Sequence, residues 1–303
     1  MWSLDDLNVY DVVIAEASFA AASRRLGMTR SAVSKAIRRL EDQLEAQLFV
    51  RSTRALQLTD AGHIFHGSVQ GILTAVRRAE RMIADQKGEA AGVVKLSAPV
   101  SLGLQHLAAW VPQITRTLPR VEMDLMLTDR VIHIVEEGLD FAIRVVMVGH
   151  LPDSQLRVSR LATGTMRLCA SPDYLERRPN PETPADLQEH DCLLYTHQFG
   201  PERIGVWRFV RDGEEIDQAI TPRLRFDSGP AIRQATLGGA GVAMMPGFMV
   251  REDIDRGALI EVLPDIGKRQ YAIVALRPDT TYLAPAVRAV LNTLTERFQE
   301  LPT

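Results

Sequence analysis

The chain has 303 residues, 46% of them hydrophobic and 24% charged, and a formal net charge of −3. These values are ordinary for a soluble globular protein of two domains, or three if one is small, and they argue against a surface coated all over with positive charge. The sequence holds no apolar run as long as a membrane span. Its first residues, MWSLDDLN, carry acids where a secretory signal is basic, so we expect a cytoplasmic protein without a membrane partner.

Basic residues are concentrated near the N-terminus. Residues 24–54 contain eight basic and three acidic side chains, a local net charge of +5. The basic ones are Arg24, Arg25, Arg30, Lys35, Arg38, Arg39, Arg51 and Arg54, and the acidic ones are Glu41, Asp42 and Glu45. A compact basic stretch in an otherwise acidic protein indicates a localised contact with nucleic acid.

The first 44 residues have the pattern of three helices. Apolar residues recur at helical intervals from Leu4 to Ile14, and a second helix, capped by Ser18, turns Phe19, Ala22 and Leu26 inward. Gly27 suits the positive φ of a helix C-terminus, and Thr29 can cap a third helix. The apolar residues of that third helix are Val33, Ile37, Leu40 and Leu44. Two helices joined by a tight Gly-Met-Thr turn predict a helix-turn-helix.

The opposite face of the third helix is polar and basic. It carries Arg30, Ser31, Ser34, Lys35 and Arg38. Arginine and serine near a helix N-terminus can reach base edges in the major groove, and Lys35 and Arg38 can also anchor phosphates. The alternative is a basic face that is only solvated.

The stretch QLFVRSTRALQLT reads as a hairpin. Its two short strands, Leu48–Arg51 and Ala55–Leu58, flank a Ser-Thr-Arg tip, which turns the motif into a winged helix-turn-helix. Arg51 and Arg54 are then candidates for contact with phosphate or the minor groove; the alternative is that they only add solubility. We assign residues 1–59 to this predicted DNA-binding domain.

A long helix follows over residues 60–87. Thr59 can cap it, and the sequence has no proline until Pro99. Apolar residues recur with coiled-coil spacing at Ala61, Phe65, Val69, Ile72, Val76, Ala79 and Ile83. This stripe predicts a homodimer through the helix; the alternative is packing on the chain's own second domain. Residues 88–92 are expected to form a hinge.

Residues 93–303 read as two α/β halves. The first has the order strand, helix, strand, short helix (VIHIVEEGL), strand, which predicts a parallel sheet. The pattern restarts after Leu161, and the strand YAIVALRP with the helix Pro285–Gln299 returns to the first half. We assign residues 93–161 and 269–303 to one half and 162–268 to the other, with a ligand cleft between them.

The predicted cleft has candidate residues at helix and strand ends. Pro99, Val100 and Ser101 lead into one helix, and Ser228 and Gly229 lead into another, so their amides would favour an anion such as a carboxylate on a small molecule. Strand ends add Thr128 and Pro246. For each of these the alternative is a structural cap or turn. Arg144 could bind an anion or pair with a nearby acid.

The sequence has no catalytic constellation. GGAGVA from Gly238 does not fit the dinucleotide-binding pattern, and we find no Walker loop, GxSxG or HExxH motif. Cys169 and Cys192 lack metal-site spacing and read as small buried thiols. We therefore expect neither an enzyme nor a cofactor or metal site. A solute-binding protein without a DNA role is the alternative, although it would not account for residues 1–60.

Over residues 5–66 the chain closely resembles LysR-type transcriptional regulators. The resemblance is carried by SFAAASRRLGMTRSAVSKAIRRLEDQL and LFVRSTRALQLTDAG, and more loosely by EEGLDFAIRV, CASPDYL and GGAGVAMMPGFMV. It implies a winged helix-turn-helix, a linker-helix dimer that commonly becomes a tetramer, and a periplasmic-binding-protein-like effector domain. It also implies control by a small-molecule effector, with a carboxylate or aromatic metabolite as the class-level expectation, at a promoter often beside the regulator's own gene.

Two positions depart from the family pattern. Glu45 stands where the family usually has glycine, so we expect a less tight turn or a longer helix before the wing. His133 stands where an acid is frequent, so effector-domain contacts at that position are not carried over.

Overall fold

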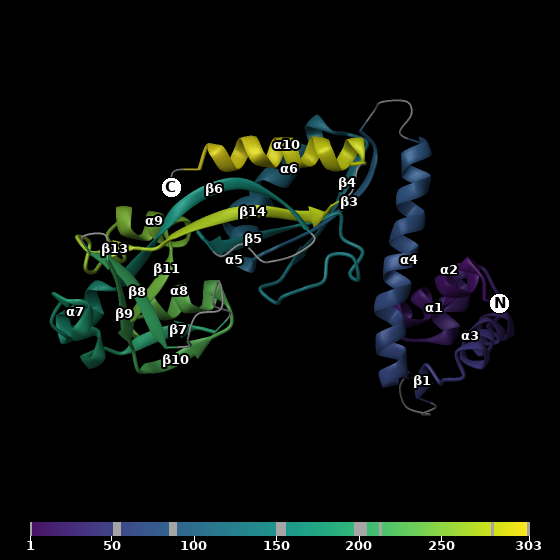
Figure 1. Cartoon of the computed structure of the whole chain (residues 1–303), viewed down its shortest axis with the longest axis horizontal. Coiled ribbons are helices and arrows are strands. Elements are labelled where there is room, and N and C mark those ends of the chain that lie inside the picture. Colours follow the sequence, from purple (N-terminus) through teal and green to yellow (C-terminus); the bar gives the residue numbers. More distant parts are fainter. Residues whose placement is uncertain are drawn as a thin grey trace. The chain divides into compact units, whose positions relative to one another are not determined.

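The computed structural model describes residues 2–50, 56–84, 90–149, 156–196, 205–211, 214–279 and 282–301 (Figure 1). The chain forms two compact units. Met1–Gly88 with Ile132–Leu139 make up the first, and Glu89–Val131 with Asp140–Thr303 make up the second.

Three helices open the first unit at the predicted positions. They are α1 (Leu4–Glu16), α2 (Phe19–Leu26) and α3 (Arg30–Leu44). The predicted caps are present: the Ser18 hydroxyl accepts a hydrogen bond from the Ala21 amide at 3.3 Å, and the Thr29 hydroxyl accepts one from the Ala32 amide at 3.2 Å. Gly27 has φ +64°. Local side-chain chemistry thus accounts for each helix boundary in the turn.

The wing hairpin follows α3. Its strands β1 (Phe49–Val50) and β2 (Gln57–Leu58) are antiparallel. One carboxylate oxygen of Glu41 accepts hydrogen bonds from the amides of Leu48 at 2.9 Å and Phe49 at 3.4 Å. An acid inside the basic stretch therefore holds the start of the wing against α3. With the hairpin in place, the predicted winged helix-turn-helix is confirmed.

The long helix α4 (Asp60–Ala84) begins as predicted, with the Gly62 amide bonded to the Thr59 hydroxyl at 3.0 Å. Its predicted apolar stripe is divided. Val69 is fully buried in the core of the head, and Phe65 packs against the same core, so the expectation that these two face a second subunit is wrong. The reason is that Tyr10 of α1 binds this part of α4. Its hydroxyl donates to the Gly62 carbonyl at 2.8 Å, and its ring lies 5.3 Å from that of Phe65.

Two further expectations for this unit need correction. The helix α3 ends at Leu44 because Glu45 itself adopts the left-handed conformation, with φ 50°, that glycine usually supplies. The predicted short helix over VIHIVEEGL is a series of turns instead. This stretch is rich in β-branched residues, which disfavour a helix, and two of them, Val131 and Val135, are 91% and 50% exposed, so packing does not offset that preference at these positions.

The second unit is built on one large sheet with strand order β10-β7-β11-β6-β14-β5-β3-β4. In the first half, β3 (Gly92–Ala98) is parallel to β4 (Val121–Leu127) and β5 (Phe141–Met147). In the second half, β7 (Cys192–Tyr195) is parallel to β10 (Pro222–Phe226) and β11 (Val242–Pro246). The halves are joined by antiparallel β6 (Leu156–Ala170) and β14 (Gln270–Pro278), which pair along their length.

Short strands complete the second unit. β12 (Ile260–Glu261) pairs with β6, and β8 (Val206–Arg211) forms a small separate sheet with β9 (Glu214–Ala219) and β13 (Gly267–Lys268). The predicted hairpin at 206–217 is therefore present, while its Asp212-Gly213 turn lies outside the described residues.

Helices cover the sheet of both halves. In the first half, α5 (Val100–Leu102), a π-helical turn (Gly103–Leu107) and α6 (Ala108–Thr117) run without a break and share one core with α10 (Pro285–Gln299) (Figure 1). In the second half, α8 (Gly229–Leu237) and α9 (Gly247–Asp255) form one core with β11, and α7 (Pro172–Arg177) belongs to another. The helix α9 was not expected from the sequence. None of the described helices has the length and apolarity needed to cross a membrane.

Candidate functional site

The outward face of α3 is the first candidate site. Arg30, Ser31, Lys35 and Arg38 are exposed on it and Ser34 is half-buried, as the helical spacing predicts. On the inward face Val33, Ile37 and Leu40 are at most 3% exposed. Arg51 and Arg54 of the wing lie outside the described residues. The burial of one side of α3 thus leaves its basic side available to a partner.

An ion pair between a buried carboxylate of α1 and an exposed arginine of α3 holds α3 in this orientation. Asp6 of α1 is 2% exposed and accepts hydrogen bonds from the Arg39 guanidinium, one of them at 3.3 Å from Nε. Burial raises the pKa of the Asp6 carboxyl, but the hydrogen bonds from Arg39 and Ser3 outweigh it and hold that pKa below its ordinary value. Arg39 is itself exposed, but its guanidinium is bonded to Asp6 and so holds α3 against α1.

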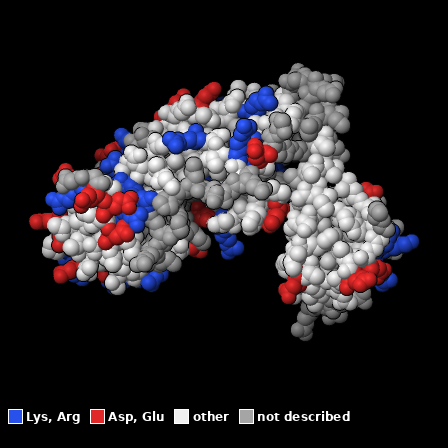
Figure 2. All heavy atoms as spheres, viewed as in Figure 1, with Lys and Arg blue, Asp and Glu red and all other residues white. Residues whose placement is uncertain are grey.

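Charge on the second unit is distributed differently. On the face shown in Figure 2, the described Lys and Arg side chains are interspersed with Asp and Glu, and no large patch of one sign is visible. Part of this mixing is ion pairing, as between Arg208 and Glu215 at 3.2 Å. On this face the second unit thus carries charges of both signs side by side.

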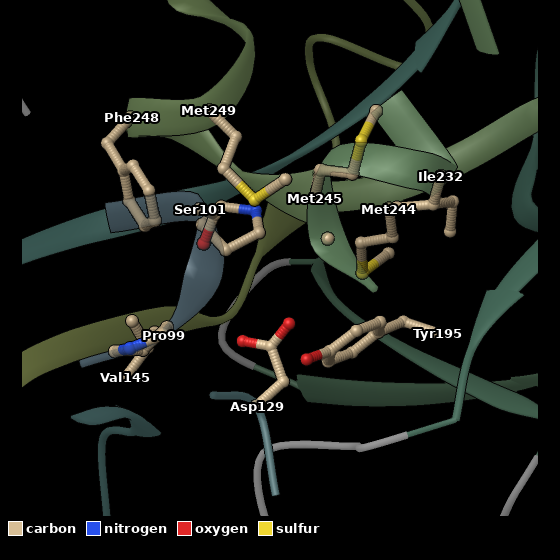
Figure 3. A pocket seen from close by; sticks show the side chains of 12 residues that line it. Pro99, Ser101, Asp129, Val145, Tyr195, Ile232, Met244, Met245, Phe248 and Met249 are labelled. Carbon is tan, nitrogen blue, oxygen red and sulfur yellow. The ribbon is translucent and has the colours of Figure 1, made fainter. Parts of the chain in front are cut away.

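The second candidate site is a pocket between the two halves of the large sheet (Figure 3). About 380 Å³ in and around it is not filled by atoms, a volume that includes open solvent. Its walls are Pro99, Ser101, Asp129, Val145, Tyr195, Gly229, Ile232, Met244, Met245, Pro246, Phe248 and Met249. These residues come from the ends of strands in both halves and from the starts of α5, α8 and α9. This is the position predicted for a ligand in an open α/β sheet.

Four of the predicted effector residues line this pocket: Pro99, Ser101, Gly229 and Pro246. Val100, Thr128, Arg144 and Ser228 do not. The Val100 amide donates to Asp129 Oδ1 at 3.1 Å, and the Thr128 hydroxyl accepts from the Arg130 amide at 3.2 Å, which makes Thr128 a turn residue. The Ser228 carbonyl accepts a hydrogen bond from the Ile232 amide at 3.1 Å, which is the first backbone hydrogen bond of α8.

Arg144 lies behind the pocket wall. It is adjacent to Val145, and neighbouring side chains on a strand point to opposite faces. One of its terminal nitrogens donates to the Ile143 carbonyl at 2.6 Å, and the other is buried without a hydrogen-bond partner. Burial lowers the pKa of Arg144, while the Asp129 carboxylate opposes that shift.

Asp129 and Tyr195 are the polar pocket residues that the sequence reading missed. Figure 3 shows the carboxylate and the phenol pointing into the cavity on one side, with Phe248, Met249 and Met245 on the other. Burial raises the pKa of Tyr195, and the carboxylates of Asp129 and Asp227 raise it further, so the phenol stays protonated. Asp129 directly follows Thr128 beyond the end of β4. Thr128 was selected because ligands bind beyond strand ends in such sheets, and the same reasoning applies to Asp129.

Contacts across the two halves position the far wall. Gln105 of the first half donates to the Met249 carbonyl at 3.0 Å, and the Phe248 amide donates to the Tyr271 hydroxyl at 3.3 Å. The His106 ring stacks on Trp110 at 5.6 Å and lies 6.0 Å from Phe248. Phe248 and Met249 belong to α9, the helix that was not predicted, which is why their role was not seen in the sequence.

The described residues contain no group of three or more His, Cys, Asp or Glu side chains that could hold a metal ion. Cys169 and Cys192 are both buried, as expected. Burial raises the pKa of each thiol to about 12, so both remain protonated at neutral pH.

Comparison with known families decides the identity. Residues 4–63 match the bacterial regulatory helix-turn-helix protein model of the lysR family, and residues 87–299 match the LysR substrate binding domain. The chain belongs to the LysR family. It is a DNA-binding transcriptional regulator with an effector-binding domain, and the resemblance noted from the sequence is confirmed.

Relatives of this LysR-type regulator cover nearly its whole length. The regulator PtxR of Pseudomonas aeruginosa is 31% identical over 300 residues, which is 99% of this chain and 94% of that protein. The activator AaeR of Escherichia coli is 30% identical over 304 residues, covering 99% and 96%. Both relatives are named as transcriptional regulators.

Solved structures of the family have the same fold. CrgA of Neisseria meningitidis matches with a TM-score of 0.62 and 28% identity over 97% of this chain and 98% of that one. A full-length variant of AphB matches with a TM-score of 0.68 and 25% identity over the same shares. The combination of a DNA-binding head and an α/β effector domain is therefore that of full-length LysR-type regulators, which are oligomeric.

Proposed function

We propose that this regulator reads its operator through the exposed face of α3 and is controlled by a small molecule in the pocket of the second unit. The observation that carries the DNA half is the division of α3 into a buried apolar side and an exposed side bearing Arg30, Lys35 and Arg38. Arg30, Ser31 and Ser34 would reach base edges, and Lys35, Arg38, Arg51 and Arg54 would hold phosphates. Residues 1–59 would act as the DNA-binding domain and 93–303 as the effector domain.

Control would come from the two halves of the second unit. A molecule bound between them contacts both, so it favours the arrangement in which both sets of contacts are made. We infer that this shift changes how the DNA-binding heads of an oligomer are presented to two half-sites. Pro99, Ser101, Gly229 and Pro246 would touch the effector directly; Val100, Thr128, Arg144 and Ser228 would act, if at all, by supporting the wall.

We infer a homodimer through α4, the helix predicted over residues 60–87, with a tetramer built from two such dimers. The exposed side of the helix supports this inference. Ile64 is 76% exposed and Ile72 is 37% exposed. Together with Ser68, Ala75 and Ala79, all exposed, they recur at spacings of four, four, three and four residues, which is the rhythm of a two-stranded seam.

We also propose that the protein acts at promoter DNA in the cytoplasm and that it has no catalytic activity. The test uses the purified full-length chain and the DNA just upstream of its own gene, with binding measured at several salt concentrations and against scrambled competitor DNA. We expect tight binding that resists the competitor and falls steeply with salt, because phosphate contacts release counterions. Weak binding that scrambled DNA removes equally well would contradict the DNA role and favour a solute-binding protein.

A further inference from the structure

Glu41 links the C-terminal end of α3 to the start of the wing. Its backbone carbonyl accepts hydrogen bonds from the Glu45 amide, which ends the helix, and from the Ala46 amide at 3.1 Å. Its carboxylate oxygen Oε1 accepts hydrogen bonds from the amides of Leu48 at 2.9 Å and Phe49 at 3.4 Å. One residue of α3 therefore holds both the turn that leaves the helix and the first strand of the wing.

The base of the wing is also attached to the start of α4 and to the core. The Leu48 carbonyl accepts a hydrogen bond from the Thr59 amide at 3.1 Å, and the Gln47 carbonyl accepts one from the Thr59 hydroxyl at 2.6 Å. The side chains of Leu48 and Phe49 are at most 5% exposed in the core of the head. Among the described residues, the hydrogen bonds that tie β1 to α3 are those accepted by Glu41 Oε1. Removing that oxygen should therefore free the wing from α3 and leave the base of the wing folded.

The charge of Glu41 opposes the proposed role of the head. Glu41 is one of only three acidic side chains in residues 24–54, where eight are basic. It is half-buried, so part of its field reaches the solvent, and a carboxylate close to DNA is repelled by the phosphates. What this side chain can contribute to DNA binding is thus its geometry, because two amides of the wing need an acceptor at this position.

We infer that Glu41 is a positioning residue for DNA binding: it fixes the wing to α3, so that both contact one half-site at the same time. This inference rests on the proposed function, in which α3 reads base edges and the wing arginines hold phosphates. Phosphate contacts set the register of a protein on the duplex, so a wing fixed to α3 sets the register of α3 more narrowly than a wing that can shift. A wing already in place also avoids the entropy loss of ordering it on the DNA.

The test measures binding of the full-length chain to the DNA just upstream of its own gene, at several salt concentrations, for the parent chain and three variants. Glu41→Ala removes the acceptor. It should weaken binding at least about fivefold and reduce the salt slope, because the phosphates contacted by the wing are released. Glu41→Gln keeps an acceptor oxygen and removes the charge, so it should bind at least as tightly as the parent chain. Asp42→Ala is the control and should cause no loss, because Asp42 is the neighbouring acid of α3 and is exposed.

A double-mutant cycle shows whether Glu41 acts through the wing. The wing variant carries Arg51→Ala and Arg54→Ala together. If Glu41 acts through the wing, the losses from Glu41→Ala and the wing variant overlap, and the combined variant binds little more weakly than the weaker of the two. The losses from Glu41→Ala and Arg30→Ala, at the start of α3, should multiply instead. A general loss of head stability would multiply with both, so this comparison separates positioning from folding.

Three results would overturn the inference. They are parent-like binding by Glu41→Ala, equal losses in Glu41→Ala and Asp42→Ala, and a wing variant whose loss is absent or multiplies with that of Glu41→Ala. Glu41→Gln keeps the shape of the side chain and provides a folded variant if Glu41→Ala does not fold, as judged by circular dichroism. A loss of binding in folded Glu41→Gln also overturns the inference. If the parent chain itself does not prefer this DNA to scrambled competitor, the proposed function fails, and the inference fails with it.

Discussion

Arg233 of α8 and Asp253 of α9 form an ion pair held by two hydrogen bonds. The guanidinium donates from Nε to one carboxylate oxygen at 2.6 Å and from a terminal nitrogen to the other at 2.7 Å, and the Asp253 side chain is fully buried. Ile232 precedes Arg233, and Met249 lies one helical turn before Asp253; both line the pocket. The pair therefore joins the two helices that form one wall.

Removing this pair should loosen that wall. We expect Asp253→Asn to lower the free energy of unfolding by about 2–3 kcal/mol, since it weakens both bonds to a largely buried guanidinium. It should also weaken binding of any pocket ligand. Arg256→Gln is the control: Arg256 bonds the same carboxylate but is 62% exposed, so its loss should cost less than about 0.5 kcal/mol. Denaturant unfolding measures both, and equal effects of the two variants would contradict this account.

Glu45 predicts a stabilising substitution. Its φ of 50° is strained for a residue with a Cβ and relaxed for glycine. We expect Glu45→Gly to raise the free energy of unfolding of the DNA-binding head by about 0.5–1 kcal/mol. Glu45→Ala, which retains the Cβ, should give no such gain. If alanine stabilises the head as much as glycine, the side chain of Glu45 and not its backbone is the source of the effect.

Replacing either of two glycines of α4 by alanine should change the stability of the fold, in opposite directions at the two positions. A Cβ at Gly62 would overlap the Leu48 carbonyl oxygen, at the point where α4 passes the wing, so Gly62→Ala should cost about 1–3 kcal/mol. A Cβ at Gly67 meets only the Glu136 side chain at 3.8 Å. Gly67→Ala should therefore stabilise by about 0.5–1 kcal/mol through helix propensity. Thermal unfolding distinguishes the two, and a tolerated Gly62→Ala would show that the wing can shift.

The exposed arginines of α3 predict two kinds of DNA-binding defect. Arg30→Ala should relax sequence preference, at a cost of about 1–3 kcal/mol on the operator and little on other DNA. Arg38→Ala should weaken binding to all sequences and reduce the salt slope by about 1. Arg116→Ala, an exposed arginine of α6, is the control and should change neither. A salt slope unaffected by Arg38→Ala would remove Arg38 from the phosphate contacts.

The Asp6–Arg39 pair predicts a specific acid sensitivity. The pKa of Asp6 is lower in the folded chain than its ordinary value of 3.8, so its charge stabilises the fold above that pH and the benefit is lost as the pH falls through the folded-state pKa. We expect Asp6→Asn to be less stable than the parent chain near pH 7 and the two to converge below about pH 4. A stability difference that stays constant down to about pH 3 would assign the effect to packing.

Much of the head could be predicted because its signals are local. Ser18, Gly27 and Thr29 each act on amides or dihedral angles within three residues of themselves, and those contacts are present. The inward face of α3 likewise follows from helical spacing. Glu41 was missed because its partners, the amides of Leu48 and Phe49, become neighbours only when the wing folds back.

The sequence by itself determined the helix order of the DNA-binding head, the caps at Ser18, Thr29 and Thr59, the basic face of α3 and the family. What α4 buries was decided by the tertiary structure, since Phe65 and Val69 have the same spacing whether they meet a second subunit or the chain's own Tyr10. The pocket was decided in the same way: its walls come from distant elements, and the predicted anion site at Val100 was taken by Asp129. The local pattern of a segment reports what its residues do within one turn of the chain. Which surfaces meet depends on contacts between segments, and the pattern of either segment alone does not contain that information.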